Sequence, residues 1–157
     1  MASTDLLTGL LNRQGFMSTI NESVIDIAST NVIMYIDLDN FKYYNDTVGH
    51  EIGDFVLVLF ANILKECAKD DGYAIRYGGD EFLLLFNNKD DNYAVEVAKK
   101  IYSQIEDGFE SKIGVKLKNK VVIPDDKKLS CCIGIAQFTS NSHEAIDEAF
   151  DHAEEAL

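Results

Sequence analysis

Long hydrophobic runs are missing from this sequence of 157 residues. No segment approaches the ~20 consecutive apolar residues that a bilayer-spanning helix needs, so the sequence predicts no transmembrane helix. Met1 is followed by polar residues instead of an apolar run, and we therefore expect no secretory leader. Internal repeats and low-complexity stretches are also missing.

Basic residues are scarce. The sequence has 14 Lys and Arg residues against 27 Asp and Glu residues, a formal net charge of −13. Such a surface repels nucleic acids and anionic membranes, so we expect neither as a partner. A nucleotide ligand stays possible, because bound metal ions can supply the local positive charge.

Cysteine is also sparse. The three cysteines are Cys67, Cys131 and Cys132, and their positions match neither a zinc site nor a disulfide framework. This pattern predicts a reducing, cytoplasmic compartment. The hydrophobic fraction of 46% is enough, over this length, for one domain with a substantial core.

The most informative stretch is residues 74–86, AIRYGGDEFLLLF. Two β-prone runs flank Gly78 and Gly79, which predicts a tight hairpin in which glycine takes a positive φ. Asp80 and Glu81 then stand side by side at the tip, where their repulsion calls for a cation or water. A solvated acidic turn is the alternative, but the glycines also leave the backbone bare enough for a phosphate chain.

A second acidic strand end lies upstream. The apolar run 31–36 ends in Asp37, Leu38 and Asp39. Two acidic strand ends in a small domain predict a Mg²⁺ site, since Mg²⁺ prefers carboxylates together with phosphate oxygens. Helix capping is the alternative for both acids, and we retain it for Asp39.

Apolar periodicity and capping residues predict the remaining elements. Helices are expected over residues 12–28, 40–48, 92–105 and 144–157. One more helix is expected to follow a turn bracketed by Gly49 and Gly53 and to run to about residue 69. The expected caps are Asn12 for the first helix, Asp39 or Asn40 for the second, Asp90 or Asp91 for the fourth and Ser142 for the last. Strands are expected over residues 32–37 and 129–137, and a small hairpin pairs 115–117 with 121–123 inside an insertion at 106–128. Together these elements predict an α+β fold, a central sheet of mixed direction flanked by helices.

The chain resembles the GGDEF domain, the catalytic domain of diguanylate cyclases. The matching residues follow the family's order and spacing over about the first half of the chain. They are residues 5–13 (DLLTGLLNR), 37–42 (DLDNFK), Asn45-Asp46, Gly49-His50, Gly53-Asp54 and 76–82 (RYGGDEF). The resemblance implies a βαββαβ core like that of nucleotide cyclases and polymerase palm domains, with the Gly-Gly hairpin beside the first strand. It also implies one catalytic domain over residues 1–157, excised from a longer signalling protein.

The resemblance implies that two GTP molecules are condensed into cyclic di-GMP with release of two pyrophosphates. Each active site is expected to use two Mg²⁺ ions about 4 Å apart, with Mn²⁺ as a substitute. Asp37 and Asp80 are the implied metal ligands, together with the Leu38 carbonyl. Glu81 is assigned either to metal binding or to deprotonating the attacking hydroxyl, and both roles stay open.

The family's guanine-reading positions are Asn45 and Asp54 here. A carboxylate and an amide can distinguish guanine from adenine, and the Asp favours GTP. Without the resemblance, Asn45 reads as a helix-end residue and Asp54 as an N-cap. The resemblance also places Gly78 and Gly79 against the phosphates and Lys42 and Phe41 beside the substrate, although a solvated lysine explains Lys42 almost as well.

Two departures from the family are expected to matter. Lys69 and Gly72 stand where many members carry the Arg and Asp of an inhibitory cyclic di-GMP site, so feedback through that site should be weak or absent. The chain also ends at Leu157, before a Lys and an Arg that hold the triphosphate in the family, and GTP affinity should suffer.

Catalysis in this family needs a homodimer, because each protomer carries one GTP; a fragment without its upstream part can be monomeric and slow. The parent protein can be membrane-anchored, with this domain in the cytoplasm. The main alternative is a catalytically weak or inactive GGDEF domain that binds GTP or a partner. A polymerase-like palm is disfavoured by the net charge and the lack of a basic stripe.

Overall fold

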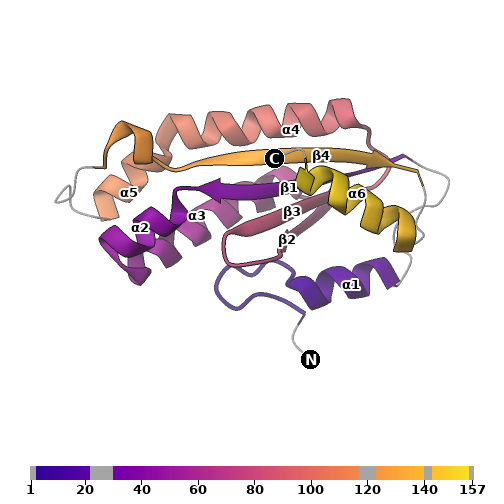
Figure 1. Ribbon diagram of the computed structural model, residues 1–157, viewed down its shortest axis with the longest axis horizontal. Helices are drawn as coiled ribbons and strands as arrows, with labels where there is room; N and C mark the ends of the chain where they lie inside the picture. Colours follow the sequence, from indigo (N-terminus) through magenta and orange to yellow (C-terminus); the bar gives the residue numbers. More distant parts are fainter. Residues whose placement is uncertain (1–2, 22–29, 117–122, 140–142, 156–157) are drawn as a thin grey trace.

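The computed structural model describes residues 3–21, 30–116, 123–139 and 143–155. Within these ranges four strands form one sheet in the order β2-β3-β1-β4 (Figure 1). Their bounds are β1 Asn31–Asp39, β2 Gly72–Arg76, β3 Glu81–Phe86 and β4 Ser130–Phe138. The α+β class with helices packed around a central sheet is confirmed.

All three strand pairings are antiparallel, so the prediction of a mixed sheet is wrong. The reason is the order of the strands. The hairpin reverses the chain, so that β3 lies beside β1 and runs against it, whereas β2, which runs parallel to β1, is moved to the edge. β4 pairs with the other side of β1 and also runs against it.

Helices cover both faces of this sheet (Figure 1). Their bounds are α1 Arg13–Asn21, α2 Phe41–Val48, α3 His50–Ala68, α4 Asp91–Gln104, α5 Glu110–Lys116 and α6 His143–Glu155. One core cluster joins the sheet to α2, α3, α4 and α5, and a second joins the opposite face to α1 and α6. None of the helices that the structure describes is long and apolar enough to cross a bilayer.

β1 is the central strand, as its uniformly apolar sequence predicts. Six consecutive residues from Asn31 onward are buried. Because successive side chains of a strand point to opposite faces, Val32, Met34 and Ile36 enter the first core cluster and Ile33 and Tyr35 enter the second. The acids Asp37 and Asp39 lie on the same face as Ile33 and Tyr35, at the end of the strand where that face becomes partly exposed, while Leu38 stays buried on the other face.

Two of the predicted helix caps are confirmed. The Asn12 side chain accepts a hydrogen bond from the Gly15 amide at 2.8 Å, and the Asp90 carboxylate accepts one from Tyr93 at 2.9 Å. Both satisfy amide groups that the first turn of a helix leaves without an internal partner. The predicted continuation of the first helix over residues 22–28, the Ser142 cap and residues 156–157 lie outside the described residues.

The predicted hairpin within 106–128 is wrong in its first arm. A π-helical turn, Ile105–Phe109, follows α4 and leads into α5, which includes Val115. Phe109 and Ile113 are almost fully buried four residues apart, a spacing that fits one face of a helix. Val115 is 73% exposed, so the apolar residue that suggested a strand has no core to enter. The second arm lies mostly outside the described residues.

Candidate active site

Two acidic strand ends meet at one end of the sheet. Asp37 of β1 is paired with Glu81 of β3, and the Leu38 amide donates a hydrogen bond of 3.1 Å to the Asp80 carbonyl. The β2–β3 turn therefore lies against the end of β1, although 42 residues separate Leu38 from Asp80 in the sequence. This juxtaposition, which sequence spacing alone cannot establish, is present in the fold.

The turn between β2 and β3 is closed by the Glu81 carbonyl, which accepts hydrogen bonds from the amides of Tyr77 at 2.8 Å and Gly78 at 3.1 Å. The prediction that the glycine pair supplies positive φ is wrong, since Gly9 and Gly49 are the glycines with positive φ among the described residues. Gly78 has a different reason: a Cβ there would run into the Glu81 carboxylate. Gly79 faces open space, which leaves its backbone accessible.

Asp37 lies in an unfavourable electrostatic environment. Partial burial raises its pKa, and the neighbouring charges of Asp80 and Asp39 raise it further. Each of these causes disfavours the ionised form. A cation bound among the carboxylate oxygens of Asp37 and Asp80 would instead favour the ionised form of Asp37.

The donor set at this end fits Mg²⁺ shared with a phosphate ligand. Among the described residues, no three His, Cys, Asp or Glu side chains converge on one point. The oxygens that could hold a metal are the carboxylates of Asp37 and Asp80 and the Leu38 carbonyl. Mg²⁺ is commonly held by one or two carboxylates and completes its shell with water and phosphate oxygens, so this limited set is appropriate.

Asp39 and Asn40 have contacts that the sequence did not reveal. The Asp39 carboxylate accepts hydrogen bonds from Ser130 Oγ at 3.0 Å and from Cys132 Sγ at 3.3 Å. Asn40 stands at the N-cap of α2 with φ of 67°, but its side chain makes no capping hydrogen bond. Instead its amide donates to the Lys128 carbonyl at 2.9 Å. The predicted side-chain cap of α2 is therefore wrong, because both side chains reach toward β4.

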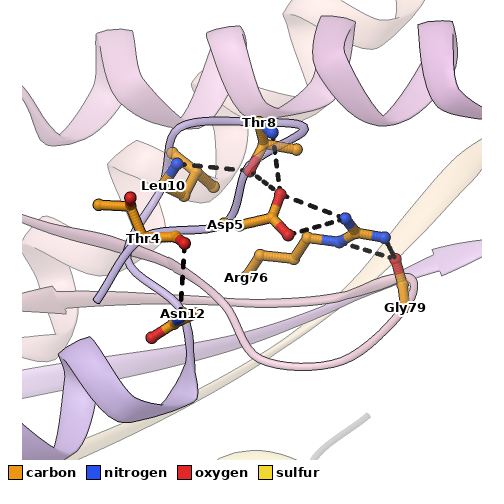
Figure 2. A network of polar contacts seen from close by, with 7 residues as sticks. All are labelled: Thr4, Asp5, Thr8, Leu10, Asn12, Arg76 and Gly79. Atoms are coloured by element: carbon orange, nitrogen blue, oxygen red, sulfur yellow. Dashed lines mark hydrogen bonds and ion pairs between the residues drawn. The ribbon is translucent and has the colours of Figure 1, made fainter. Parts of the chain in front are cut away.

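The N-terminal segment forms a polar network beside the β2–β3 turn (Figure 2). The Asp5 carboxylate accepts hydrogen bonds from Thr8 Oγ1 at 2.7 Å and from the Thr8 amide at 2.8 Å. Thr8 Oγ1 in turn accepts from the Leu10 amide at 3.3 Å. The loop carrying the Asp-Leu-Leu-Thr sequence is thus fixed by its own acid and hydroxyl.

Arg76 links this loop to the hairpin tip, as Figure 2 shows. Its Nη1 atom contacts both Asp5 carboxylate oxygens at 3.1 and 3.2 Å, and its Nε and Nη2 atoms donate to the Gly79 carbonyl at 3.2 and 2.9 Å. Burial by itself raises the pKa of Asp5, but the Thr8 hydrogen bonds and the Arg76 charge outweigh it and the pKa is lowered. Arg13 stacks over the Tyr77 ring at 4.2 Å on the same turn. These contacts give Arg76 and Tyr77 a structural role at the β2–β3 turn.

Asn45 and Asp54 lie on the paired helices α2 and α3. α3 begins at His50, so Gly53 belongs to its first turn and the predicted Gly49–Gly53 turn is wrong. A Cβ at Gly53 would collide with the amide oxygen of Asn45, which explains the glycine as a site of close approach. Asp54 is exposed inside the helix and does not cap it.

Phe41 and Lys42 are the first two residues of α2; the Phe41 side chain is buried and the Lys42 side chain is exposed. Phe41 is only 8% exposed and belongs to the first core cluster, where it holds α2 against α3. Lys42 is exposed and leaves its ammonium group free to reach solvent or an anion. Of this pair, Lys42 has the geometry for a ligand contact.

Comparison with known proteins identifies the family of the chain. The sequence model of the family described as "Diguanylate cyclase, GGDEF domain" matches residues 2–157. This chain belongs to the GGDEF family.

Curated relatives of this GGDEF domain include Diguanylate cyclase A of Treponema denticola, 34% identical over 98% of this chain and 41% of that protein. Diguanylate cyclase DosC of Escherichia coli strain K12 is 34% identical over 98% of this chain and 32% of that protein. Cyclic di-GMP phosphodiesterase PdeR of the same strain is 33% identical over 87% of this chain and 19% of that protein. The chain thus spans less than half the length of these relatives.

Solved structures share the fold. The GGDEF domain of FimX from Pseudomonas aeruginosa superposes with a TM-score of 0.74 at 18% identity, covering 99% of this chain and 94% of that one. The diguanylate cyclase SiaD of Pseudomonas aeruginosa, solved with its activator SiaC, gives 0.75 at 24% identity, covering 99% and 56%. At these identities the likeness establishes the fold alone.

A cavity of about 530 Å³ lies at the opposite end of the β2–β3 hairpin from the acidic tip of this GGDEF domain. Lys69 and Gly72, the positions of the predicted departure from the inhibitory motif, both line it, together with Lys89. The Lys69 ammonium is 2.9 Å from the Glu66 carboxylate on the same helix end. The side chain that replaces the family arginine is thus engaged in a local ion pair.

Proposed function

We propose that this GGDEF domain is a diguanylate cyclase that condenses two GTP molecules into cyclic di-GMP. The observation that carries the proposal is the meeting of Asp37 with the Asp80–Glu81 tip at one end of the sheet. Like charges gathered around a partly buried carboxylate favour a site for divalent cations and phosphates. The sequence relatives named as diguanylate cyclases support the same reaction.

In this proposal, Asp37, Asp80 and the Leu38 carbonyl hold Mg²⁺, or Mn²⁺ in its place, with two ions in each site. The metal supplies neutralisation of phosphate charge and activation of a hydroxyl. Glu81 is positioned to take the proton of the attacking 3′-hydroxyl or to complete the metal site. The bond formed joins the 3′-oxygen to the α-phosphorus of the other GTP, and pyrophosphate leaves as the bond from the α-phosphorus to the bridging oxygen breaks.

Substrate selection is assigned to α2 and α3. Asp54 accepts hydrogen bonds from the N–H groups on the guanine edge, and Asn45 reads the neighbouring edge. Adenine presents the opposite donor pattern to a carboxylate, so GTP is favoured over ATP. We assign the phosphate contacts to Lys42 and to the backbone of Gly78 and Gly79. Phe41 is assigned a supporting role, because its packing in the core holds the helix that carries Lys42.

Product formation needs two protomers, because each active site presents one GTP to the other. We place this reaction in the cytoplasm, where reduced thiols and GTP are both found. Cys67, Cys131 and Cys132 are free thiols, in agreement with a reducing compartment.

The decisive experiment is incubation of the concentrated protein with GTP and Mg²⁺, followed by detection of cyclic di-GMP by mass spectrometry. Asp80→Ala should abolish product, whereas Asp147→Ala, which removes an exposed carboxylate from α6, should leave it close to the wild-type level. Product made equally well by Asp80→Ala would refute the assigned site. Wild-type protein that binds GTP tightly and forms a dimer, yet makes no product, would refute the cyclase assignment.

A second candidate function is a GGDEF domain that binds GTP or a protein partner without catalysis. The match to PdeR, a protein named as a cyclic di-GMP phosphodiesterase, is the observation that favours it, since a GGDEF domain evidently also belongs to proteins with another activity. Calorimetric titration with a non-hydrolysable GTP analogue separates the two. Saturable binding with no product at any protein concentration would select this alternative.

We propose further that product inhibition through the cavity at Lys69 and Gly72 is weak. At the two motif positions, the cavity has a lysine that pairs with Glu66 where the family uses an arginine, and a glycine where it uses an acid. Arginine binds phosphate with two parallel hydrogen bonds and lysine with a point charge. Titration of cyclic di-GMP into the Asp80→Ala protein should show no tight site, and a tight site lost in Lys69→Ala would contradict this.

A further inference from the structure

We propose that Asp39 and Asn40 form a positioning clamp that fastens the metal-binding end of β1 to β4; this rests on the proposed function of Asp37. The clamp, as we define it, consists of Asp39 and Asn40 on one side and Ser130, Cys132 and the Lys128 carbonyl on the other. None of these groups is expected to touch the substrate. Their effect is on where Asp37 and the Leu38 carbonyl lie.

The register of the sheet shows why this end of β1 needs support. On the β3 side, strand pairing stops at Asp37 opposite Glu81. On the β4 side it continues for two more residues, to Asp39 opposite Ser130. Beyond Asp37, the β2–β3 turn still holds Leu38 through the Asp80 carbonyl, and Asp39 is paired with β4. Metal ligands must be held to within about 0.5 Å to work, so the contacts of Asp39 with β4 bear on the position of Asp37.

The clamp lies at the last pair of the β1–β4 register, Asp39 opposite Ser130. Ser130 Oγ donates to Asp39 at 3.0 Å, and Cys132 Sγ lies 3.3 and 3.4 Å from its two carboxylate oxygens. Cys132 is also the residue of β4 directly opposite Asp37. The Asp39 carboxylate thus contacts both the β4 residue opposite Asp39 itself, Ser130, and the β4 residue opposite Asp37, Cys132.

Asn40 holds the chain where it leaves the strand. It adopts φ of 67°, a left-handed conformation that asparagine tolerates better than most residues. Its amide donates to the Lys128 carbonyl at 2.9 Å, on the segment that enters β4. Asp39 and Asn40 together therefore fix both the end of β1 and the reversal into α2, which carries Lys42 and Asn45.

The clamp can be tested without changing the charge near the metal. Ser130→Ala combined with Cys132→Ala removes both donors to Asp39 and should weaken Mn²⁺ binding, measured by electron paramagnetic resonance with a non-hydrolysable GTP analogue, by about tenfold, as is typical for groups that orient metal ligands. Cys132→Ser keeps a donor at that position, and in the Ser130 wild-type background it should bind Mn²⁺ within about twofold of the wild type. Asn40→Gly keeps the left-handed backbone but deletes the amide and should also weaken binding.

Controls separate positioning from stability. Ser103→Ala removes a hydroxyl that donates to Asp107 at 3.3 Å on the exposed surface of α4, and should leave Mn²⁺ affinity unchanged. Thermal denaturation of each variant reports any general loss of stability. The proposal is overturned if the Ser130→Ala/Cys132→Ala protein binds Mn²⁺ as the wild type does, or if its affinity falls only in proportion to a loss of folded protein.

The outcome for the clamp is distinct from the outcome for the cyclase. Wild-type protein without cyclase activity, but with Mn²⁺ binding that depends on Asp37 and on the clamp, would refute the proposed reaction and support the clamp. Mn²⁺ binding that is unchanged in Asp37→Ala would refute the metal site, and the clamp with it.

Discussion

At the scale of single residues, Asp37 is assigned to metal binding, but its ionised side chain lowers the stability of the metal-free fold. Its pKa is raised by burial and by the charges of Asp80 and Asp39, so the folded protein holds this proton more tightly than the unfolded chain does. The stability associated with the carboxyl is therefore greatest at low pH and is lost as the pH rises through the raised pKa. At neutral pH without metal, the ionised side chain opposes folding.

Asp37→Asn should therefore stabilise the metal-free protein while abolishing metal binding. For a partly solvated site the gain is below about 1 kcal/mol, which for a domain of this size corresponds to a Tm increase of up to about 3 °C. Calorimetry at neutral pH in the presence of a chelator measures it, and the gain should vanish below about pH 4. Asp147→Asn, an exposed acid on α6, is the matched control. A lower Tm for Asp37→Asn at neutral pH would contradict this account.

The close approach of Gly53 to Asn45 leads to a second prediction for a single residue. Alanine favours a helix over glycine by about 1 kcal/mol, but its Cβ would meet the Asn45 amide oxygen, which can rotate away. Gly53→Ala should therefore keep or slightly raise Tm and yet weaken binding of a GTP analogue several-fold. Gly108→Ala, at a glycine with open space around its Cβ position, should leave binding unchanged. Unchanged affinity in Gly53→Ala would argue against a role for Asn45 in reading guanine.

At the scale of structural elements, the Asp5–Arg76 ion pair connects the N-terminal loop to the β2–β3 turn. The two side chains are 21% and 17% exposed, and Arg76 continues to the Gly79 carbonyl (Figure 2). Bonds of this charge-assisted kind are stronger than neutral ones. Because the pKa of Asp5 is lowered, the stability it contributes is complete at neutral pH and is lost as the pH falls below about 4.

A double-mutant cycle with Asp5→Asn and Arg76→Gln should yield a coupling free energy of about 1–2 kcal/mol at neutral pH. The same cycle on Glu96 and Lys99, an ion pair on α4 whose side chains are about 70% exposed, should yield less than about 0.5 kcal/mol. Urea denaturation supplies the four free energies of each cycle. Equal coupling in both pairs would mean that the Asp5–Arg76 contact acts only as a surface ion pair.

The elements themselves were predicted well wherever apolar periodicity was strong. The central strand β1, the hairpin and the helices α3 and α4 all form close to the expected residues, because each buries a continuous face that local spacing reveals. The prediction for residues 106–128 was wrong because this segment lacks a clear apolar periodicity. Val115 and Lys116 carry no decisive periodicity, and the burial of Phe109 and Ile113 selected a helix instead.

At the scale of the whole molecule, the net charge of −13 bears on assembly. In the proposed reaction two copies of this domain face each other; with this net charge they repel at long range, and salt screens the repulsion. Raising the ionic strength from about 0.05 M to about 0.15 M, where the Debye length is ~8 Å, should therefore shift a GTP-bound sample toward dimer in sedimentation experiments. Sodium and potassium chloride should act alike. Dissociation on adding salt would instead indicate a dimer held by opposite charges.

The sequence by itself determined the order and type of most elements, the acidic strand end at Asp37, the hairpin with Asp80 and Glu81 at its tip, and the family. These are local properties, because burial periodicity and motif spacing are written along the chain. The tertiary structure decided the antiparallel direction of the sheet, the route of Arg76 to Asp5, and the engagement of Asp39 by Ser130, 91 residues further on. Contacts of that kind depend on which strands become neighbours and in which register, and a one-residue change of register would send the side chains of the shifted strand to the other face.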